Sequence, residues 1–252
     1  MAILDLSKIK TAKELEERAR QDLEGKTLSE IADWVSKSDK TSRVLSKASV
    51  GYVVEEGYFG LGKNNSAEPD LATLGVELKT SPLKKGRDGK LRVKEPLSLN
   101  IINYIQECKN ENLSQSSLYK KNRKILFVWY VHDDGLRSAY VIKYVFLWEM
   151  TPAILAELEP DYQAILQMIR KGEAHHIHQH QHQSLTLCPK HGGTFRDPND
   201  KKSKTKQPYS DAPAEIRAFR LKNSYMNLVI HRYLSKFKKD KISEFVTPKN
   251  GD

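Results

Sequence analysis

Residues Pro69 to Lys79 read PDLATLGVELK, a stretch that contains two carboxylates, Asp70 and Glu77, and one lysine, Lys79. Its last four residues, VELK, alternate between apolar and charged side chains. Because successive side chains of a strand point to opposite faces, the alternation predicts a strand over 73–80 with one buried face. Glu77 and Lys79 would be neighbours on the other face, about 6.6 Å apart.

Asp70 lies in the turn before this strand, from which it can fold back beside Glu77 and Lys79. Two carboxylates that converge repel each other and attract a hard divalent cation. Such a cation polarises a phosphate oxygen and lowers the pKa of a bound water, while a nearby ammonium stabilises the growing charge. The three side chains suffice for phosphodiester hydrolysis, although a Glu–Lys pair on an exposed strand often has no function.

Upstream of this stretch the sequence predicts helices. Those expected over 11–25 and 27–36 each begin with a threonine and a glutamate three residues later, which is a capping box. A third helix is expected over 49–58, before a glycine-containing turn.

Downstream, an Asp88-Gly89 turn predicts a hairpin, and Thr151-Pro152 predicts the start of a helix over 151–171. Apolar and β-branched residues predict strands at 97–105, 124–132, 136–148, 217–222 and, more weakly, 184–187. The polar stretch 196–213 is expected to be a loop, and 223–237 a final helix. We find no internal repeat, so the order of elements predicts an α/β or mixed α+β fold with one central sheet.

The composition favours a polyanionic partner. Lys and Arg number 42 against 32 Asp and Glu, which gives a formal net charge of +10. The N-terminal residues show no basic n-region followed by an apolar h-region, so no signal peptide is expected, and the longest apolar run, 125–131, is far too short to span a bilayer. Cys108 and Cys188 form no CxxC pair, which excludes a zinc ribbon and a disulfide framework. We therefore expect a cytoplasmic protein with no membrane partner.

Several stretches resemble one known family. GYVVEEGYFG, EPD and GVELKTSPLKK are similar to the family of MutH, the mismatch-repair nicking enzyme. They resemble still more closely the type II restriction endonucleases that cut GATC and are kin to MutH within the PD-(D/E)xK superfamily. LSLNIINY, QPYSD and AFRLKNSYM continue the resemblance in the same order, so that it covers about Ser49 to Leu234. Several separated matches are more specific than one short pattern.

The resemblance implies roles for individual residues. Asp70 and Glu77 would hold Mg²⁺ together with the carbonyl of Leu78, and Lys79 would be the catalytic lysine. A helical glutamate of the family lies in a GxxxE pattern, which here ends at Glu55.

The assignments of the helical glutamate and of a second lysine each leave an alternative open. Glu56 fits the helical glutamate better than Glu55 if the spacing is counted back from Gly60. A further family lysine matches Lys121 in KNRKIL and would contact phosphate near the site; the alternative is an ordinary solvated charge.

DNA recognition is expected elsewhere. In the resembling family a lysine in the loop before the last strand reads the site, and LCPKHGG places Lys190 there; the alternative is an ordinary surface lysine. Gly192 and Gly193 would allow close approach of the backbone. The MutH family has a tyrosine where this chain has Arg220, which puts sensing of adenine methylation in doubt. For Arg220 the alternatives are a contact to phosphate, a contact to a base, and a position outside the DNA interface.

Three further segments are polar. The basic stretches KKGRDGK (84–90) and DKKSKTKQ (200–207) either wrap the duplex by neutralising phosphates or are solvated loops. In HHIHQHQH (175–182) alternate imidazoles could hold a transition metal, but no acidic residue or cysteine adjoins them, so we expect a polar linker.

The resemblance implies a restriction-endonuclease-like fold, a central mixed sheet flanked by helices, with two lobes around a DNA cleft. Residues 1–252 would form a single catalytic domain, with 1–48 as its helical N-terminal part and 49–252 as its catalytic and recognition core. Because the restriction relatives usually carry a second C-terminal domain, the chain is expected to be a truncated or a compact relative.

The expected activity is Mg²⁺-dependent, type II, site-specific cleavage of double-stranded DNA at GATC, with 5′-phosphate ends. A cognate methyltransferase would act in the same system, and a palindromic site would suit a transient dimer on DNA. The alternatives are a MutH-like strand-nicking enzyme of mismatch repair and a DNA-binding domain without catalysis. The paired carboxylates argue against the last of these.

Overall fold

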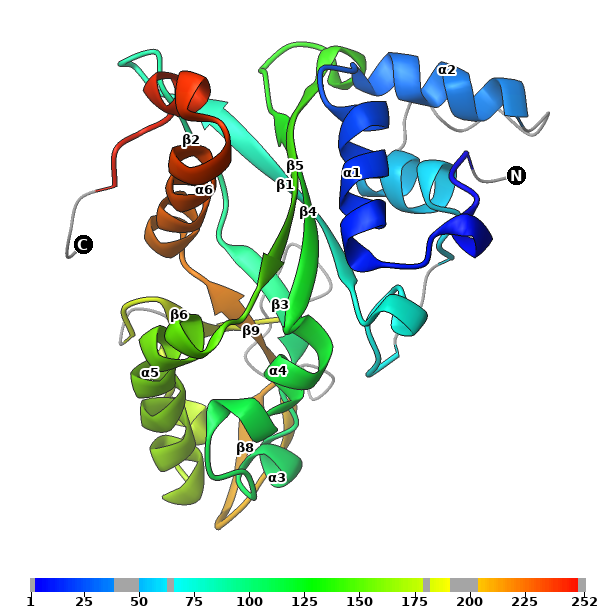
Figure 1. The fold of residues 1–252 in the computed structure, drawn as a ribbon. Helices are drawn as coiled ribbons and strands as arrows, with labels where there is room; N and C mark the ends of the chain where they lie inside the picture. Colours follow the sequence, from blue (N-terminus) through cyan, green and yellow to red (C-terminus); the bar gives the residue numbers. More distant parts are fainter. Residues whose placement is uncertain (1–2, 39–49, 63–65, 179–181, 191–203, 249–252) are drawn as a thin grey trace. The chain divides into compact units, whose positions relative to one another are not determined.

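The structure of the protein is a computed structural model that describes residues 3–38, 50–62, 66–178, 182–190 and 204–248 (Figure 1). The chain divides into two compact units, each made of several segments. The first contains Met1–Glu95, Lys124–Glu149 and Lys238–Val246. The second contains Pro96–Arg123, Met150–Phe237 and Thr247–Asp252. The expectations of one catalytic domain and of a DNA cleft stay predictions.

The first unit is built on a mixed sheet with the strand order β2-β1-β4-β5. Its strands are β1 (Glu77–Lys85), β2 (Leu91–Val93), β4 (Lys124–Val131) and β5 (Val141–Glu149). β1 runs parallel to β4, whereas the other two pairings are antiparallel. The central strand β4 is apolar along its length because Ile125 to Trp129 are all buried, which is typical of a strand covered on both faces.

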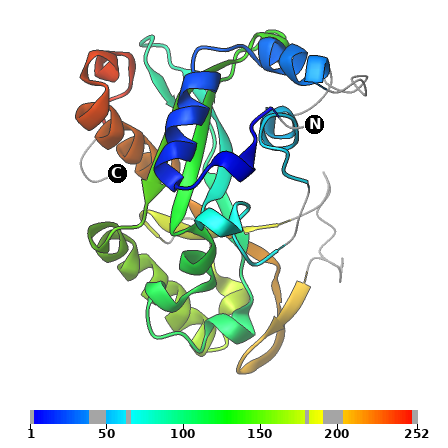
Figure 2. The ribbon, with the colours of Figure 1, turned by 45° about the vertical axis from the view of Figure 1, so that its right-hand side comes forward.

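Two helices, α1 (Ala12–Leu23) and α2 (Leu28–Ser38), belong to this unit, and α1 lies against β5 (Figures 1 and 2). Both predicted capping boxes are present. The amide of Glu14 donates to Thr11 Oγ1 at 3.1 Å, and the amide of Glu30 donates to Thr27 Oγ1 at 3.2 Å. The mixed α/β class predicted from the sequence is thus confirmed.

The strand predicted over 73–80 begins later and runs further, from Glu77 to Lys85. Ala72–Leu74 form a 3-10 turn, and Gly75 ends it with a φ of +63°, a conformation that glycine adopts without steric cost. The predicted hairpin after β1 is confirmed, since the amide of Gly86 donates to the carbonyl of Lys90 at 2.8 Å.

The second unit holds two smaller sheets that the expectation of one central sheet did not include. The strand order β3-β9-β6 joins Leu97–Ile101, Arg217–Leu221 and Leu185–Pro189. β7 (Lys204–Gln207) and β8 (Ser210–Glu215) form a separate hairpin. The helices of this unit are α3 (Tyr104–Glu107), α4 (Ser117–Asn122), α5 (Pro152–Arg170) and α6 (Asn223–Phe237).

Three predicted elements differ from the structure. The strand expected over 97–105 stops at Ile101, because the side chain of Asn103 accepts the amides of Ile105 and Gln106 and so caps α3. The strand expected over 136–148 begins at Val141, after a 3-10 turn. The prediction of a loop over 196–213 is wrong for residues 204–213, because β7 and β8 pair there.

The remaining short helical segments are η1 (Leu6–Lys8), η3 (Tyr52–Tyr58), η4 (Ala72–Leu74), η5 (Leu113–Gln115), η6 (Arg137–Ala139), η7 (Ala174–His176) and η9 (Lys239–Glu244). η3 is a π-helix and lies in the helical stretch predicted over 49–58. In the part of the chain that is described, no helix is long and apolar enough to cross a membrane.

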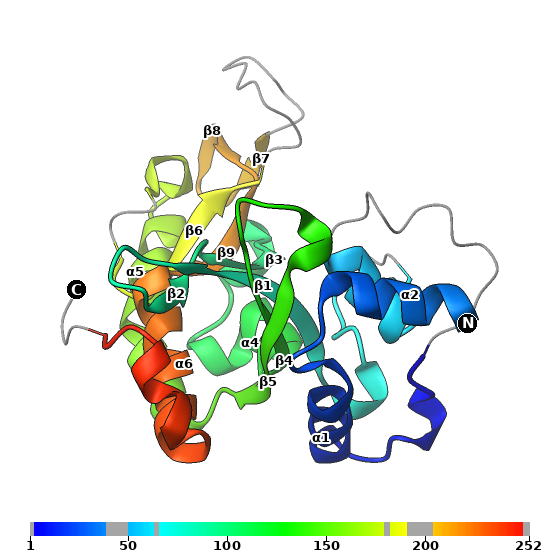
Figure 3. The ribbon, with the colours of Figure 1, turned by 90° about the horizontal axis from the view of Figure 1, so that it is seen from above.

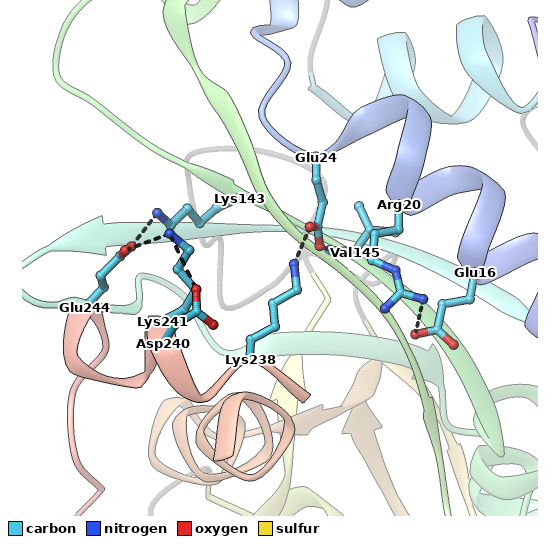
Figure 4. Close-up of polar contacts among 9 residues, drawn as sticks. All are labelled: Glu16, Arg20, Glu24, Lys143, Val145, Lys238, Asp240, Lys241 and Glu244. Atoms are coloured by element: carbon cyan, nitrogen blue, oxygen red, sulfur yellow. Dashed lines mark hydrogen bonds and ion pairs between the residues drawn. The ribbon is translucent and has the colours of Figure 1, made fainter. Parts of the chain in front are cut away.

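Ion pairs bind the segment after α6 to the first unit (Figure 4). Lys238 bonds to Glu24, whose other carboxylate oxygen accepts the amide of Val145 at 2.7 Å. Lys143 Nζ lies 2.5 Å from Glu244 Oε2, and this contact holds the pKa of Glu244 below its usual value. The segment also touches the sheet, because the amide of Val246 donates to the carbonyl of Leu91.

Candidate active site

The turn before β1 brings Asp70 back to Glu77. Leu71 and Val76 form an antiparallel bridge, with N···O distances of 2.9 and 3.2 Å, which closes the intervening residues into a loop. The amide of Asp70 donates to Glu77 Oε2 at 3.1 Å, and the amide of Leu78 donates to Asp70 Oδ2 at the same distance. Each carboxylate is therefore held by the backbone beside the other.

Lys79 points to the same place. Its Nζ donates to Glu77 Oε1 at 2.5 Å, as the alternation along β1 predicted for side chains on one face. The solvated pair considered as the alternative does not describe Glu77, which is only 1% exposed. A buried carboxylate next to an ammonium is costly to desolvate, so its placement is held by these specific hydrogen bonds.

Glu55 joins this group from the π-helix η3 (Tyr52–Tyr58). Burial raises the pKa of Glu55, and repulsion from Asp70 and Glu77 adds to the shift, while the charge of Lys79 opposes it. Glu55 also hydrogen-bonds to the side chain of Thr80. Of the two glutamates that competed for this position, Glu55 thus lies within electrostatic reach of the other three charged residues.

The backbone around Glu55 is unusual. The amide of Phe59 donates to the carbonyl of Val54, the i to i+5 bond of a π-helix, a rare form that often occurs at functional sites. Gly51 precedes it, and a Cβ at Gly51 would stand 3.3 Å from Glu55 Oε1 and 3.4 Å from Thr80 Oγ1. The glycine of the GxxxE pattern therefore leaves room for the glutamate at its end.

The donor set suits a hard divalent cation. Asp70, Glu77 and Glu55 all offer carboxylate oxygens, and three acidic side chains against one lysine leave excess negative charge. Within the described ranges, no three acidic, histidine or cysteine side chains already stand in positions to share a metal ion. The oxygens of Asp70 and Glu77 accept backbone amides and Lys79 Nζ instead, so a cation would compete with Lys79 for Glu77.

The other predicted residues belong to the second unit. Lys121 is half-buried near the end of α4 (Ser117–Asn122). Lys190 is exposed directly after β6, and its amide donates to the carbonyl of Ile216 at 2.8 Å. Arg220 lies on the neighbouring strand β9, where its buried Nε has no hydrogen-bond partner among the described residues. Gly192 and Gly193 lie outside the described residues.

The histidine-rich stretch is described only at its two ends. His175 Nδ1 lies 2.8 Å from Gln207 Nε2, and its ring contacts that of His176. His182 is buried, and burial lowers its pKa. These polar contacts are consistent with a polar connector. The contact between His175 and Gln207 was not predicted from the sequence, because it joins residues far apart in the chain.

Thr80 is the residue of the site that the sequence analysis missed. It directly follows Lys79, yet its hydrogen bond to Glu55 depends on how η3 lies against β1. Only the pairing of these two separated segments reveals it.

Comparison with known proteins gives two relatives and one family. Residues 59–161 match the family described as MutH, the DNA mismatch repair enzyme MutH. The chain is 38% identical over 192 residues to the type II restriction enzyme Sau3AI of Staphylococcus aureus. The aligned region covers 75% of this chain but 37% of that protein. It is 29% identical over 181 residues to the DNA mismatch repair protein MutH of Shewanella amazonensis, covering 70% of this chain and 76% of that one.

Proposed function

We propose that this chain, which its sequence matches relate to the MutH-like restriction endonucleases, is a Mg²⁺-dependent type II endonuclease that hydrolyses double-stranded DNA at GATC. The observation that carries the proposal is the convergence of Asp70, Glu77, Lys79 and Glu55 in one unit of the fold. Because the chain spans only 37% of the length of the restriction enzyme it matches, the activity of that whole protein is also part of the proposal.

Asp70 and Glu77 would hold the metal ion, together with the carbonyl of Leu78. When bound, Mg²⁺ polarises the scissile phosphate and supplies an activated water. Glu55 adds a third carboxylate next to these two. Burial raises the pKa of Glu55, and repulsion from Asp70 and Glu77, which a cation would neutralise, adds to the shift.

Lys79 has two partners in this proposal. Without a cation its ammonium neutralises Glu77. Displaced from Glu77, the ammonium would stabilise the negative charge that develops on the phosphate. The flexible side chain of lysine allows the ammonium to move from one partner to the other. The products would be a 5′-phosphate and a 3′-hydroxyl.

Recognition would lie in the second unit. Lys190 directly follows β6, and Arg220 lies on the adjacent strand β9, opposite Thr186; in this proposal both serve base reading, with Gly192 close to Lys190 in sequence. Lys121 would contact phosphate. The proposal further includes a cytoplasmic location, a cognate methyltransferase in the same system and a transient dimer on the palindromic site.

A second candidate activity is strand nicking. The chain covers 76% of the mismatch repair protein MutH, twice the share that it covers of the restriction enzyme. The same charged residues would serve either reaction, because nicking and double-strand cleavage differ in the number of strands cut rather than in the chemistry at each phosphate.

Supercoiled plasmid tests both candidates. The wild-type protein, Asp70→Ala and the control Asp133→Ala, which removes an exposed loop carboxylate, are each incubated with Mg²⁺ and with EDTA. Linear product from the wild type and the control, dependent on Mg²⁺, supports the restriction activity, whereas open-circle product alone supports nicking. Binding without cleavage by all three proteins would refute an endonuclease.

A further inference from the structure

The β7–β8 hairpin ends in a two-residue turn, Pro208-Tyr209, because Gln207 pairs with Ser210. Proline suits the first position of a type II turn, and the second position requires a positive φ that glycine or asparagine ordinarily supplies. Tyr209 occupies it with a φ of +60° and is the one non-glycine residue with positive φ among those described. The turn therefore holds a strained aromatic residue.

The ring of Tyr209 does not compensate for this strain by packing, because the residue is 76% exposed. The backbone at the tip, in contrast, lies close to the end of α5. A Cβ at Gly172 would stand 2.5 Å from the carbonyl oxygen of Tyr209, so only glycine fits there. The tip is held against the body of the unit while its ring faces solvent.

Gln207 completes this support. It is buried, its Oε1 accepts the amide of Ala174 at 2.8 Å, and its Nε2 donates to the carbonyl of Ala212 at 2.5 Å. The conformation of the tip is thus imposed by neighbours on two sides. Strained residues that persist because their surroundings over-determine them are concentrated at ligand contacts.

Exposed lysines outnumber exposed acidic residues around the hairpin, three to two. Lys204 and Lys206 are exposed on β7, and Lys171 is exposed at the end of α5 beside Gly172. Asp211 on β8 and Glu173, on the other side of Gly172, are the exposed acidic residues near the tip. In Figure 3 the hairpin extends beyond the neighbouring strands β6 and β9. Because its tip packs against the end of α5 and Gln207 is buried, the hairpin would offer duplex DNA one exposed surface, with the ring of Tyr209 at its tip.

We propose that Tyr209 is a DNA contact at the tip of this hairpin, with Lys204 and Lys206 neutralising adjacent phosphates. The phenol would donate a hydrogen bond to the DNA, and the ring would pack against it. The inference rests on the proposed function, because it takes duplex DNA to be the substrate. It adds a contact that is remote in sequence from Lys190 and from the candidate catalytic residues.

Fluorescence anisotropy with a labelled GATC duplex in Ca²⁺ tests this contact. Tyr209→Gly and Tyr209→Asn remove the ring and accept the positive φ, so both should unfold at the wild-type temperature or higher. We expect each to bind DNA about tenfold more weakly. The pair Lys204→Ala and Lys206→Ala should reduce the slope of log Kd against log salt by roughly 0.9 per lysine.

Phe237→Ala is the matched control, since Phe237 is an exposed aromatic beside a lysine but has an ordinary helical backbone. If Tyr209→Gly binds as tightly as the wild type, or if Phe237→Ala loses as much affinity, the inference is overturned. In that case plasmid cleavage by the wild type would leave the proposed function standing. A wild-type protein that neither binds nor cleaves DNA overturns both.

Discussion

Replacing Lys79 with methionine separates the two roles given to this lysine. In the structure its ammonium is the charged partner of Glu77, whose carboxylate is almost fully buried. Lys79→Met keeps the length of the side chain but removes the ammonium from beside this carboxylate. The variant should therefore lose stability as well as cleavage.

The size of the loss follows from burial. Removing one partner of a fully buried ion pair costs about 3–5 kcal/mol. The side chain of Lys79 is 23% exposed, so water replaces part of its contribution, and we expect about 2 kcal/mol. For a chain of this length, each kcal/mol corresponds to about 2–4 °C, which gives a decrease in unfolding temperature of roughly 4–8 °C.

Thermal unfolding in EDTA and in Mg²⁺ measures this effect. Mg²⁺ should restore part of the lost stability, because a cation bound to Glu77 replaces the ammonium. The double variant Lys79→Met/Glu77→Gln, which removes the buried charge, should be more stable than Lys79→Met. The control Lys124→Met breaks a pair with the exposed Glu149 and should cost less than about 1 kcal/mol.

Two results would refute this reasoning. One is a Lys79→Met protein that unfolds in EDTA within a degree of the wild type. The other is a double variant that is no more stable than the single one, since the loss could then not come from taking the ammonium away from the charged carboxylate of Glu77.

Three more predictions concern individual contacts. Because burial raises the pKa of Glu55, the wild type loses stability as pH rises through that pKa; Glu55→Gln should be the more stable protein at pH 7, and the difference should disappear below about pH 4 in urea unfolding. Gly172→Ala should cost about 1–3 kcal/mol in the same assay, whereas Gly135→Ala, with open space around its Cβ, should be neutral. Tyr162→Phe should cost a similar amount, because its hydroxyl donates to the buried carboxylate of Glu107 at 2.9 Å; a loss below about 0.5 kcal/mol would contradict this.

Local features of the chain were predictable wherever they depend on residues a few positions apart. The capping boxes at Thr11 and Thr27, the helix that starts at Thr151-Pro152 and the apolar strand β4 follow from such short patterns. The same holds for the position of Glu77 and Lys79 on one face of β1, because the alternation along a strand is a property of the backbone alone.

Contacts between distant segments were decided by the tertiary structure. The sequence left Glu55 and Glu56 as competitors, and the packing of η3 beside β1 brings Glu55 to Thr80 and the charged group. The β7–β8 hairpin escaped prediction because its strands are polar and are defined by pairing with each other rather than by an apolar face.

For the candidate site, the sequence by itself determined which charged residues occur and that two of them share a strand face. Only the tertiary structure determined that Glu77 is buried, that Asp70 folds back onto it through the Leu71–Val76 bridge, and that a third carboxylate lies nearby. The physical reason is that burial and charge–charge repulsion depend on distances in space. Residues many positions apart along the chain acquire such distances only when their segments pack together.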